Sequence, residues 1–201
     1  MENVLIYCLV TFTVVYCPGP MTMFSLANGM SMSKISSIAG ILGGTTAYIA
    51  QILITFYSLK VIASYSEQIF QIIKIFGALY FFWMAYKQFT SKGISFIKSD
   101  TKKNESLITT YLKGLIIAGT NPKSIIFFSA LFPQFIVQNE SYIYQFLLLS
   151  SIYLFIQFTS GLSYVFFGEK ILSFFSSRSN ITTQTRVIGG MFLVIGVFFL
   201  I

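Results

Sequence analysis

Residues 4–27 read VLIYCLVTFTVVYCPGPMTMFSLA, an apolar run that is interrupted past its middle by Pro18-Gly19-Pro20. The run is long enough for a helix that crosses a bilayer. A proline inside a helix removes a backbone hydrogen bond and clashes with the preceding turn, and hydrocarbon contains no water that could repair the loss. The sequence therefore predicts a membrane-spanning helix that is broken into two half-helices, which is tolerated where the break lines a cavity or is buried in protein.

The composition of the whole chain supports a membrane protein. Of its 201 residues 55% are hydrophobic and 9% are charged, whereas soluble domains carry about 25% charged residues. Runs such as IIFFSALF do not alternate, which favours helices over the strands of a barrel. We expect an all-α membrane protein with six transmembrane helices: Val4–Ala27, Ser37–Leu59, Ile69–Phe89, Tyr111–Val137, Tyr142–Phe167 and Val187–Ile201, the last beginning near Gln184 if Arg186 snorkels.

Several functional classes are excluded by what the sequence lacks. The chain has no histidine, and no paired acids or Ser-His set for intramembrane hydrolysis, so we expect no enzyme, no metal site and no cofactor. Its two cysteines, Cys8 and Cys17, lie about half a turn out of phase on one helix, which predicts two buried thiols rather than a disulfide.

The charge distribution predicts the orientation. The net charge is +7, which we assign to membrane topology rather than to nucleic-acid binding. One set of loops and helix ends carries ten basic residues: Lys34, Lys87, Lys92, Lys98, Lys102, Lys103, Lys113, Lys170, Arg178 and Arg186. The opposite side has only Lys60, so both termini are predicted outside the cytoplasm, in the cytoplasmic (inner) membrane.

Two further expectations concern the N-terminus and the longest polar loop. The N-terminus has Glu2, no basic residue and no cleavage site, so we expect the first span to be retained. The polar loop 90–110 is predicted to be a solvated cytoplasmic connector, with binding of anionic lipid as the alternative.

The sequence contains a weak internal repeat of three spans. Pro18-Gly19-Pro20 in the first span matches Asn121-Pro122 in the fourth, and Lys74-x-x-Gly77 in the third matches Arg186-x-x-Gly189 in the sixth. Because three is odd, the second copy must cross the membrane in the opposite sense. We therefore expect one transporter domain, 1–201, made of two inverted three-helix repeats, about 1–90 and 111–201, joined by the cytoplasmic loop 91–110.

The two breaks and one buried charge define a candidate site. Asn121-Pro122 is an N-cap followed by proline at the first helical position, and Pro20 opens the other half-helix in the same way. Two half-helix N-termini would bind an anion, although two simple packing kinks are the alternative. Lys123 lies deep in its span with no deep acid to pair with. Lys74 is shallower and either lines the site or snorkels.

These motifs together resemble the LysE/RhtB family of amino-acid exporters. The resemblance rests on four motifs in order: Pro18-Gly19-Pro20; Gly40 and Gly44; Lys74, Gly77, Ala78 and Tyr80; and Asn121, Pro122, Lys123, Phe127, Phe128, Pro133, Gln134 and Phe135. It implies six helices and export of amino acids or related metabolites. Many members have a polar residue directly after P-G-P, where this chain has Met21.

We predict export of neutral amino acids such as homoserine, threonine or branched-chain types, because a cationic substrate would place a second positive charge beside Lys123. The substrate carboxylate is expected near Gly19 and Asn121 with Lys123 as counter-ion, while Tyr80, Phe127 and Phe128 hold the side chain. The expected partners are the substrate and the lipid bilayer, and homo-oligomers are compatible with the sequence. The alternatives are a channel-like or non-transporting subunit, and a thiol-disulfide electron carrier, which the lack of cysteine at Asn121 disfavours.

Overall fold

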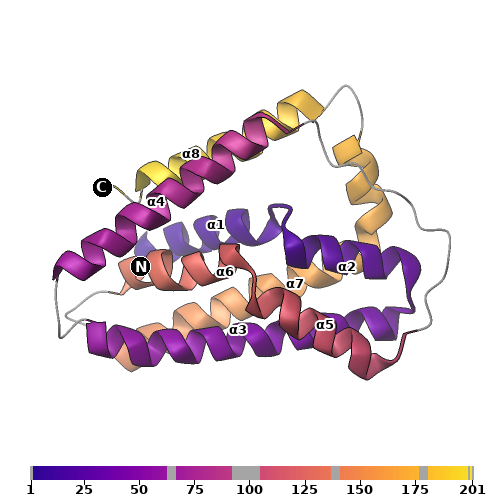
Figure 1. The fold of residues 1–201 in the computed structure, drawn as a ribbon, viewed down its shortest axis with the longest axis horizontal. Coiled ribbons are helices and arrows are strands. Elements are labelled where there is room, and N and C mark those ends of the chain that lie inside the picture. The colour runs from indigo at the N-terminus through magenta and orange to yellow at the C-terminus, as the bar shows by residue number, and fades with distance from the viewer. Residues whose placement is uncertain are drawn as a thin grey trace.

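The computed structural model describes residues 2–62, 67–91, 105–136, 141–176, 181–198 and 200. Throughout these ranges the regular structure is helical, as the sequence predicts. The helices lie roughly along one long axis, and both chain termini lie at the same end of it (Figure 1).

The first predicted break is confirmed. Helix α1 (Glu2–Tyr16) ends before Pro18, and α2 (Pro20–Ser31) begins with proline at its first position after Gly19, whose backbone is extended. Proline fixes φ for the first turn and needs no N–H partner there, so Pro20 starts a helix as readily as Pro18 ends one. The two half-helices are bent by 56°.

The second break is confirmed at Asn121, but its downstream half differs from the prediction. Helix α5 (Leu107–Gly119) is followed by α6 (Pro122–Ile126), the π-helical turn η1 (Phe127–Leu131) and the 3₁₀ turn η2 (Phe132–Phe135), with a bend of 49° at the break. We expected one half-helix to Val137. Pro133 lacks the N–H that a continuing α-helix would need, which accounts for the change of winding.

The other helices are longer than the apolar runs that predicted them. They are α3 (Lys34–Ile62), α4 (Glu67–Phe89), α7 (Tyr142–Ser176) and α8 (Ile181–Phe198). Polar and apolar residues together extend them past the predicted segments. By length and hydropathy, Lys34–Ser58 of α3 and Tyr142–Gly168 of α7 each suffice to cross a membrane, as does each bent pair if it forms one span, whereas Thr185–Phe198 of α8 is shorter.

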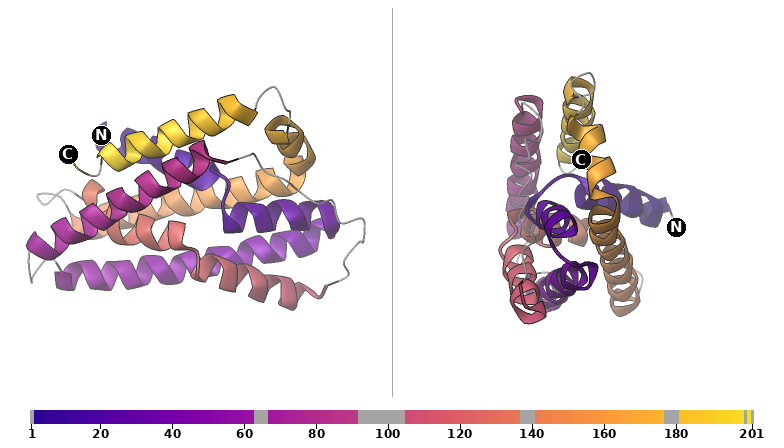
Figure 2. Two further views of the ribbon diagram at one scale, coloured as in Figure 1. Left: turned by 45° about the horizontal axis from the view of Figure 1, so that its top comes forward. Right: turned by 90° about the vertical axis from the view of Figure 1, so that its right-hand side faces the viewer.

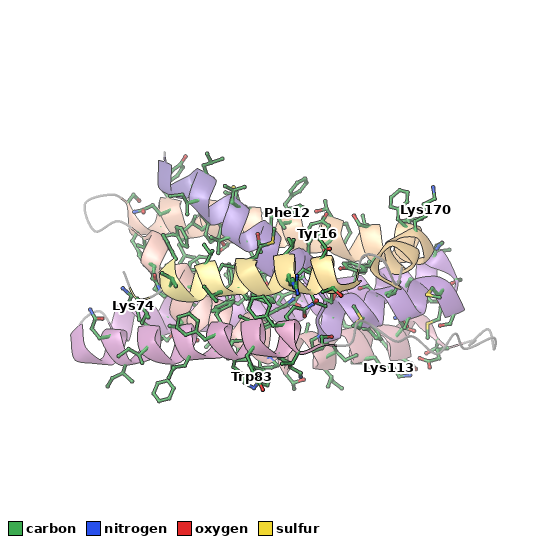
Figure 3. All side chains as sticks on the ribbon, turned by 90° about the horizontal axis from the view of Figure 1, so that it is seen from above. Phe12, Tyr16, Lys74, Trp83, Lys113 and Lys170 are labelled. Atoms are coloured by element: carbon green, nitrogen blue, oxygen red, sulfur yellow. The ribbon has the colours of Figure 1, made fainter. Side chains whose placement is uncertain are left out.

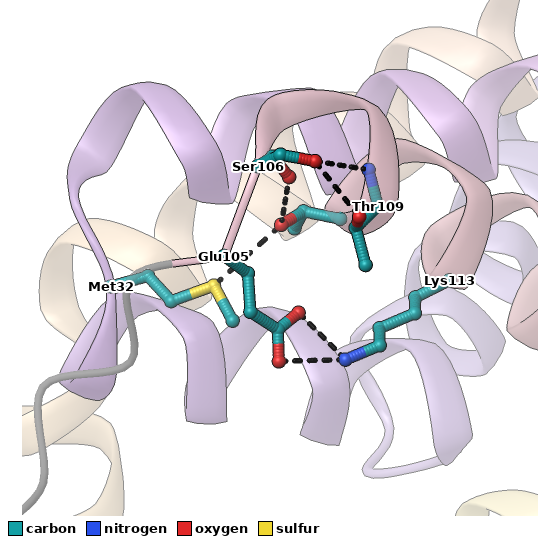
Figure 4. A network of polar contacts seen from close by, with 6 residues as sticks. Met32, Glu105, Ser106, Thr109 and Lys113 are labelled. Carbon is teal, nitrogen blue, oxygen red and sulfur yellow. Dashed lines mark hydrogen bonds and ion pairs between the residues drawn. The ribbon is translucent and has the colours of Figure 1, made fainter.

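Helix α5 begins at Leu107, within the polar loop that the sequence predicts over residues 90–110. Ser106 is the N-cap, and its side chain accepts a hydrogen bond from the Thr109 backbone N–H at 3.2 Å (Figure 4). Beside it, Glu105 forms an ion pair with Lys113 at 2.6 Å. The rest of that loop, residues 92–104, lies outside the described residues.

Packing places helices from the two halves of the chain beside each other. Helix α3 packs along α5, α2 packs against α7, and α4 packs along α8 as a pair on one side of the molecule (Figures 1 and 2). Helices α3 and α7 also touch. Glycines permit the closest approach, since a Cβ on Gly114 would overlap the Gly40 carbonyl and one on Gly43 would overlap the Tyr111 carbonyl.

The core is aromatic and the outer faces are apolar. Tyr7, Phe127 and Phe128 are almost fully buried, and the rings of Phe127 and Phe128 contact Tyr153 at centroid distances of 4.9 and 4.5 Å. Large apolar side chains also point outward along α4, α7 and α8, among them Trp83 (Figure 3). A soluble protein rarely exposes so much apolar surface, whereas lipid accepts it.

Candidate functional site

The two breaks meet at the Lys123 side chain. Lys123 is the second residue of α6 and is 7% exposed. Its ammonium donates a hydrogen bond to the Cys17 carbonyl at 2.8 Å, and a Cβ on Gly19 would lie 3.0 Å from its Nζ. Lys123 therefore bridges from the second break to the C-terminal end of α1, whose last carbonyls carry partial negative charge.

The hydrogen bond to Cys17 gives the buried Lys123 side chain one of the partners that it needs. A buried ammonium needs an acceptor, and one of its three N–H groups finds a backbone carbonyl inside the protein. Among the described residues no aspartate or glutamate pairs with it. The positive charge thus has a hydrogen-bond partner and no counter-charge from the described part of the chain.

The N-terminus of each half-helix is already partly capped. The Gly19 N–H donates to Thr22 Oγ1 at 2.7 Å, and Thr22 Oγ1 donates in turn to the Gly19 carbonyl at 2.9 Å. The Lys123 N–H donates to Asn121 Oδ1 at 3.1 Å. An anion between the N-termini would compete with these caps, so the Lys123 ammonium is the donor that is best placed for it.

A small cavity of about 20 Å³ lies beside this junction. Lys123, Asn121, Ser124, Thr22, Ser25, Gln157 and Ser160 supply its polar wall, and Val14, Val15, Met21, Tyr48, Tyr153 and Gly161 complete it. That volume holds about one water molecule. The described conformation is therefore closed around its polar centre.

Two polar atoms in this wall have no partner among the described residues. The hydroxyls of Ser25 on α2 and Ser160 on α7 are each 1% exposed and unpaired. An unpaired buried hydroxyl costs free energy and calls for a ligand or water. Both serines lie in mid-span, where the sequence does not distinguish them from polar residues that serve helix packing.

The structure places some of the remaining predicted site residues at the helix breaks and others away from the cavity. Pro18, Gly19, Pro20, Asn121 and Pro122 lie at the breaks beside Lys123. Lys74 and Tyr80, both half-buried on α4, do not line the cavity. Lys74 lies near one end of the molecule, and Lys170 lies near the other end (Figure 3). The centroid of the Tyr80 ring lies 5.7 Å from that of Trp83.

The apolar residues expected around the substrate also lie elsewhere. Phe127 and Phe128 belong to the aromatic core and do not line the cavity. Met21, which stands where a polar residue was expected, lines the cavity and packs its methyl end on Gly44. Cys17 contributes its carbonyl at the break, and both cysteines are free thiols.

Fold and site together define a helical membrane protein with two broken helices around a buried cation. The LysE type translocator family model matches residues 12–201, and the chain belongs to this family. A homoserine/homoserine lactone efflux protein of Salmonella typhimurium is 23% identical over 94% of this chain and 92% of its own length.

Two further relatives are similar to this chain, and one of them is named for its cargo. An uncharacterized membrane protein of Vibrio cholerae is 27% identical over 96% of this chain and 93% of its own length. A leucine efflux protein of Enterobacter sp. is 29% identical over 65% of this chain and 62% of its own length. No solved structure matches the chain.

Proposed function

We propose that this protein is a secondary transporter that exports neutral amino acids across the cytoplasmic membrane. The relatives named for efflux of homoserine and leucine support the class of cargo. The observation that carries the proposal is the buried Lys123 ammonium at the junction of both helix breaks, in a cavity with unpaired hydroxyls. Amino acids share a carboxylate, which is the anion that such a cation binds.

The substrate carboxylate would bind to Lys123 through the N–H groups that Cys17 does not use. Ser25 and Ser160 supply hydroxyls for the polar remainder of the substrate. A lysine or arginine substrate would add a second cation beside Lys123, and among the described residues no acid lines the cavity to offset it. This favours neutral substrates over cationic ones.

Transport requires the closed cavity to open to each side in turn. We propose that the two halves form inverted repeats that rock against each other, giving six spans in all. The helix contacts support this, because exchanging the halves turns the pairing of α1 with α7 into that of α5 with α3, and the pairing of α2 with α7 into that of η1 with α3. The pairs α4 with α8 and α3 with α7 map onto themselves.

We further propose that both termini face away from the cytoplasm. The ten basic residues on one side of the predicted spans support this orientation. A membrane-impermeant thiol reagent applied to intact cells should label a cysteine placed at Ser141 and leave one at Ser99 unlabelled. Ser99 lies outside the described residues. The reverse labelling pattern would invert the orientation.

Counterflow in proteoliposomes tests the function. Vesicles with the purified chain, preloaded with an unlabelled amino acid, should accumulate the same labelled amino acid. Homoserine, threonine and leucine should each be compared with lysine, and empty vesicles and Lys123→Met serve as controls. Accumulation of a neutral amino acid that Lys123→Met abolishes is the expected result. Counterflow of lysine alone contradicts the substrate class, and counterflow of none of the four contradicts the function.

A further inference from the structure

A second and larger cavity opens where α2 ends against α7. Its volume is about 330 Å³, and Gly29, Met30, Lys34, Val165 and Lys170 contribute to its lining. Both lysines belong to the basic side that the charge pattern assigns to the cytoplasm. The cavity is large enough for an amino acid, unlike the central one.

Buried polar residues connect the two cavities along the α2–α7 interface. On α2, Thr22, Ser25 and Asn28 are three residues apart and therefore share one face. Thr22 and Ser25 line the central cavity, whereas Asn28 directly precedes Gly29 of the second. On α7, Ser160 lines the first cavity, and Val165, little more than a turn further on, lines the second.

Three atoms along this face have no partner among the described residues. They are Ser25 Oγ, Ser160 Oγ and Asn28 Nδ2, and Asn28 is 4% exposed. A helix interface inside a membrane protein gains stability by pairing its polar groups. Unpaired groups in a row from one cavity to the next are expected where a polar solute passes.

Lys34 closes the polar face at the end that lies beside the larger cavity. Its ammonium donates to the Val165 carbonyl at 2.7 Å and to the Gly29 carbonyl at 3.2 Å, so one side chain joins α7 to α2. The backbones can approach because residue 29 is glycine, since a Cβ there would lie 2.6 Å from the Val165 carbonyl. A carboxylate that enters the cavity would compete with these two carbonyls for the ammonium.

We propose that the α2–α7 interface is the route by which substrate enters from the cytoplasm. The larger cavity is a first binding site for the carboxylate of an amino acid, and Lys34 is the latch that the carboxylate releases. This inference rests on the proposed function for the identity of the substrate. The accessibility of the route can be measured without transport.

Cysteine labelling in inside-out membrane vesicles tests the route. In the full chain with Cys8→Ser and Cys17→Ser, Asn28→Cys should react with an impermeant thiol reagent from the cytoplasmic face, and a neutral amino acid should slow the reaction. Ser25→Cys is a second reporter on the same face with a smaller change. Ser151→Cys is the matched control, because Ser151 is exposed on α7, bonds to its own helix and lines neither cavity.

Releasing the latch should open the route. Lys34→Gln added to Asn28→Cys should raise the labelling rate about tenfold, as expected when charge-assisted hydrogen bonds are lost. The same change should weaken protection by the amino acid, because the carboxylate loses its cation.

Each failure has a separate meaning. If the cysteine-free chain exports amino acids but neither reporter reacts from the cytoplasmic face, the route is wrong and the function stands. If the reporters react and the chain moves no amino acid, the function is wrong and the identity of the substrate falls with it, while the accessible path between α2 and α7 stands. If amino acids give no protection while phosphatidylglycerol, compared with phosphatidylcholine, slows labelling in reconstituted vesicles, the cavity holds a lipid phosphate and the substrate site is overturned.

Discussion

The two helix breaks are alike in sequence chemistry but differ in what satisfies their backbone. At the first break, distant side chains hold the free carbonyls: Tyr164 donates to Tyr16 at 2.7 Å and Lys123 donates to Cys17 at 2.8 Å. At the second break, Asn121 and Ser124 cap their own turn, with Ser124 Oγ donating to the Asn121 carbonyl at 3.0 Å, and the distant Gln51 adds two longer hydrogen bonds, to the Ala118 and Gly119 carbonyls at 3.2 Å. The distant hydrogen bonds at the second break are therefore longer than those at the first, and local caps supplement them.

We infer from this difference that the first break is the part that moves during transport and the second is the part that stays fixed. The second break lies on a helix that is packed closely along α3 through glycines, whereas the first depends on contacts from α6 and α7 that can be exchanged. If the halves rock during transport, the Tyr16 and Cys17 carbonyls must change partners, while the turn at Asn121 can travel intact.

Removing the cation should have the largest effect. Lys123→Ala takes away the donor to Cys17 and the proposed counter-ion of the substrate, and one charge-assisted hydrogen bond alone is worth about 1.5–3 kcal/mol. Export per inserted protein should fall at least about tenfold. The measurement is the export rate divided by the amount of protein in the membrane.

Two matched variants sharpen this result. Lys123→Arg should also fail, because a wide planar guanidinium does not replace a compact ammonium beside Gly19. Lys74→Ala should be milder, since Lys74 does not line the cavity. Export at the parental rate by Lys123→Ala would remove the lysine from the mechanism. Chromatography of the variants in detergent, which is sensitive to folding, would show whether a lower export rate comes from loss of folded protein.

The close packing of α5 on α3 can be tested next. In Gly114→Ala the new Cβ meets the Gly40 backbone, which cannot move without separating the helices. Overpacking of this kind costs about 1–3 kcal/mol. The thermal midpoint in detergent should fall.

Gly190→Ala on α8 is the control for that change, because a Cβ there meets nothing within 4 Å. It should be neutral or slightly stabilising, since alanine favours helix by up to about 1 kcal/mol. Equal midpoints for the two variants would show that α3 and α5 are not held by their glycines.

The sequence predicted the features that depend on neighbouring residues, but it did not predict contacts between residues that are far apart in the chain. Pro18, Pro20 and Asn121-Pro122 predicted both breaks, because proline acts on its own turn. Lys123 was predicted to be buried, and it is. The π and 3₁₀ turns over residues 127–135 were missed, although Pro133 signalled them, and the Ser106 cap was missed inside a polar loop.

The side chains that donate hydrogen bonds to the carbonyls at the first break could not be identified from the sequence around that break. Tyr164 contacts a carbonyl 148 positions away, and only the packing of α7 on the first span brings them together. The sequence left Lys123 without an acceptor, because a backbone carbonyl freed by a distant proline does not appear in any residue pattern. The unpaired serines are likewise recognisable only when both sides of the interface are in place.

Tyr164→Phe should have an intermediate effect. It removes one hydroxyl and leaves the Tyr16 carbonyl without its donor, at a cost of about 1–3 kcal/mol for a buried acceptor and less if water reaches it. Export should fall about threefold to tenfold. If the first break is the moving part, the loss should appear in the transport rate more than in the thermal midpoint. An equal loss in both would make Tyr164 a structural contact only.

Gln51→Leu should have the smallest effect and is the counterpart of Tyr164→Phe at the second break. Gln51 donates from Nε2 to the Ala118 and Gly119 carbonyls, both at 3.2 Å, while its own Oε1 is buried without a partner in the described structure. The Ala118 carbonyl also accepts from the Asn121 N–H at 3.2 Å and from Ser124 Oγ at 3.4 Å. Leucine therefore removes two long hydrogen bonds and one unpaired oxygen together. The Ala118 carbonyl keeps its other two donors and Gly119 is exposed, so the change costs less than leaving a buried acceptor without a partner. Export and thermal midpoint should both stay within about twofold and a few degrees of the parent. A loss as large as that of Tyr164→Phe would mean that the second break depends on its distant partner as much as the first, and the distinction between a moving and a fixed break would fail.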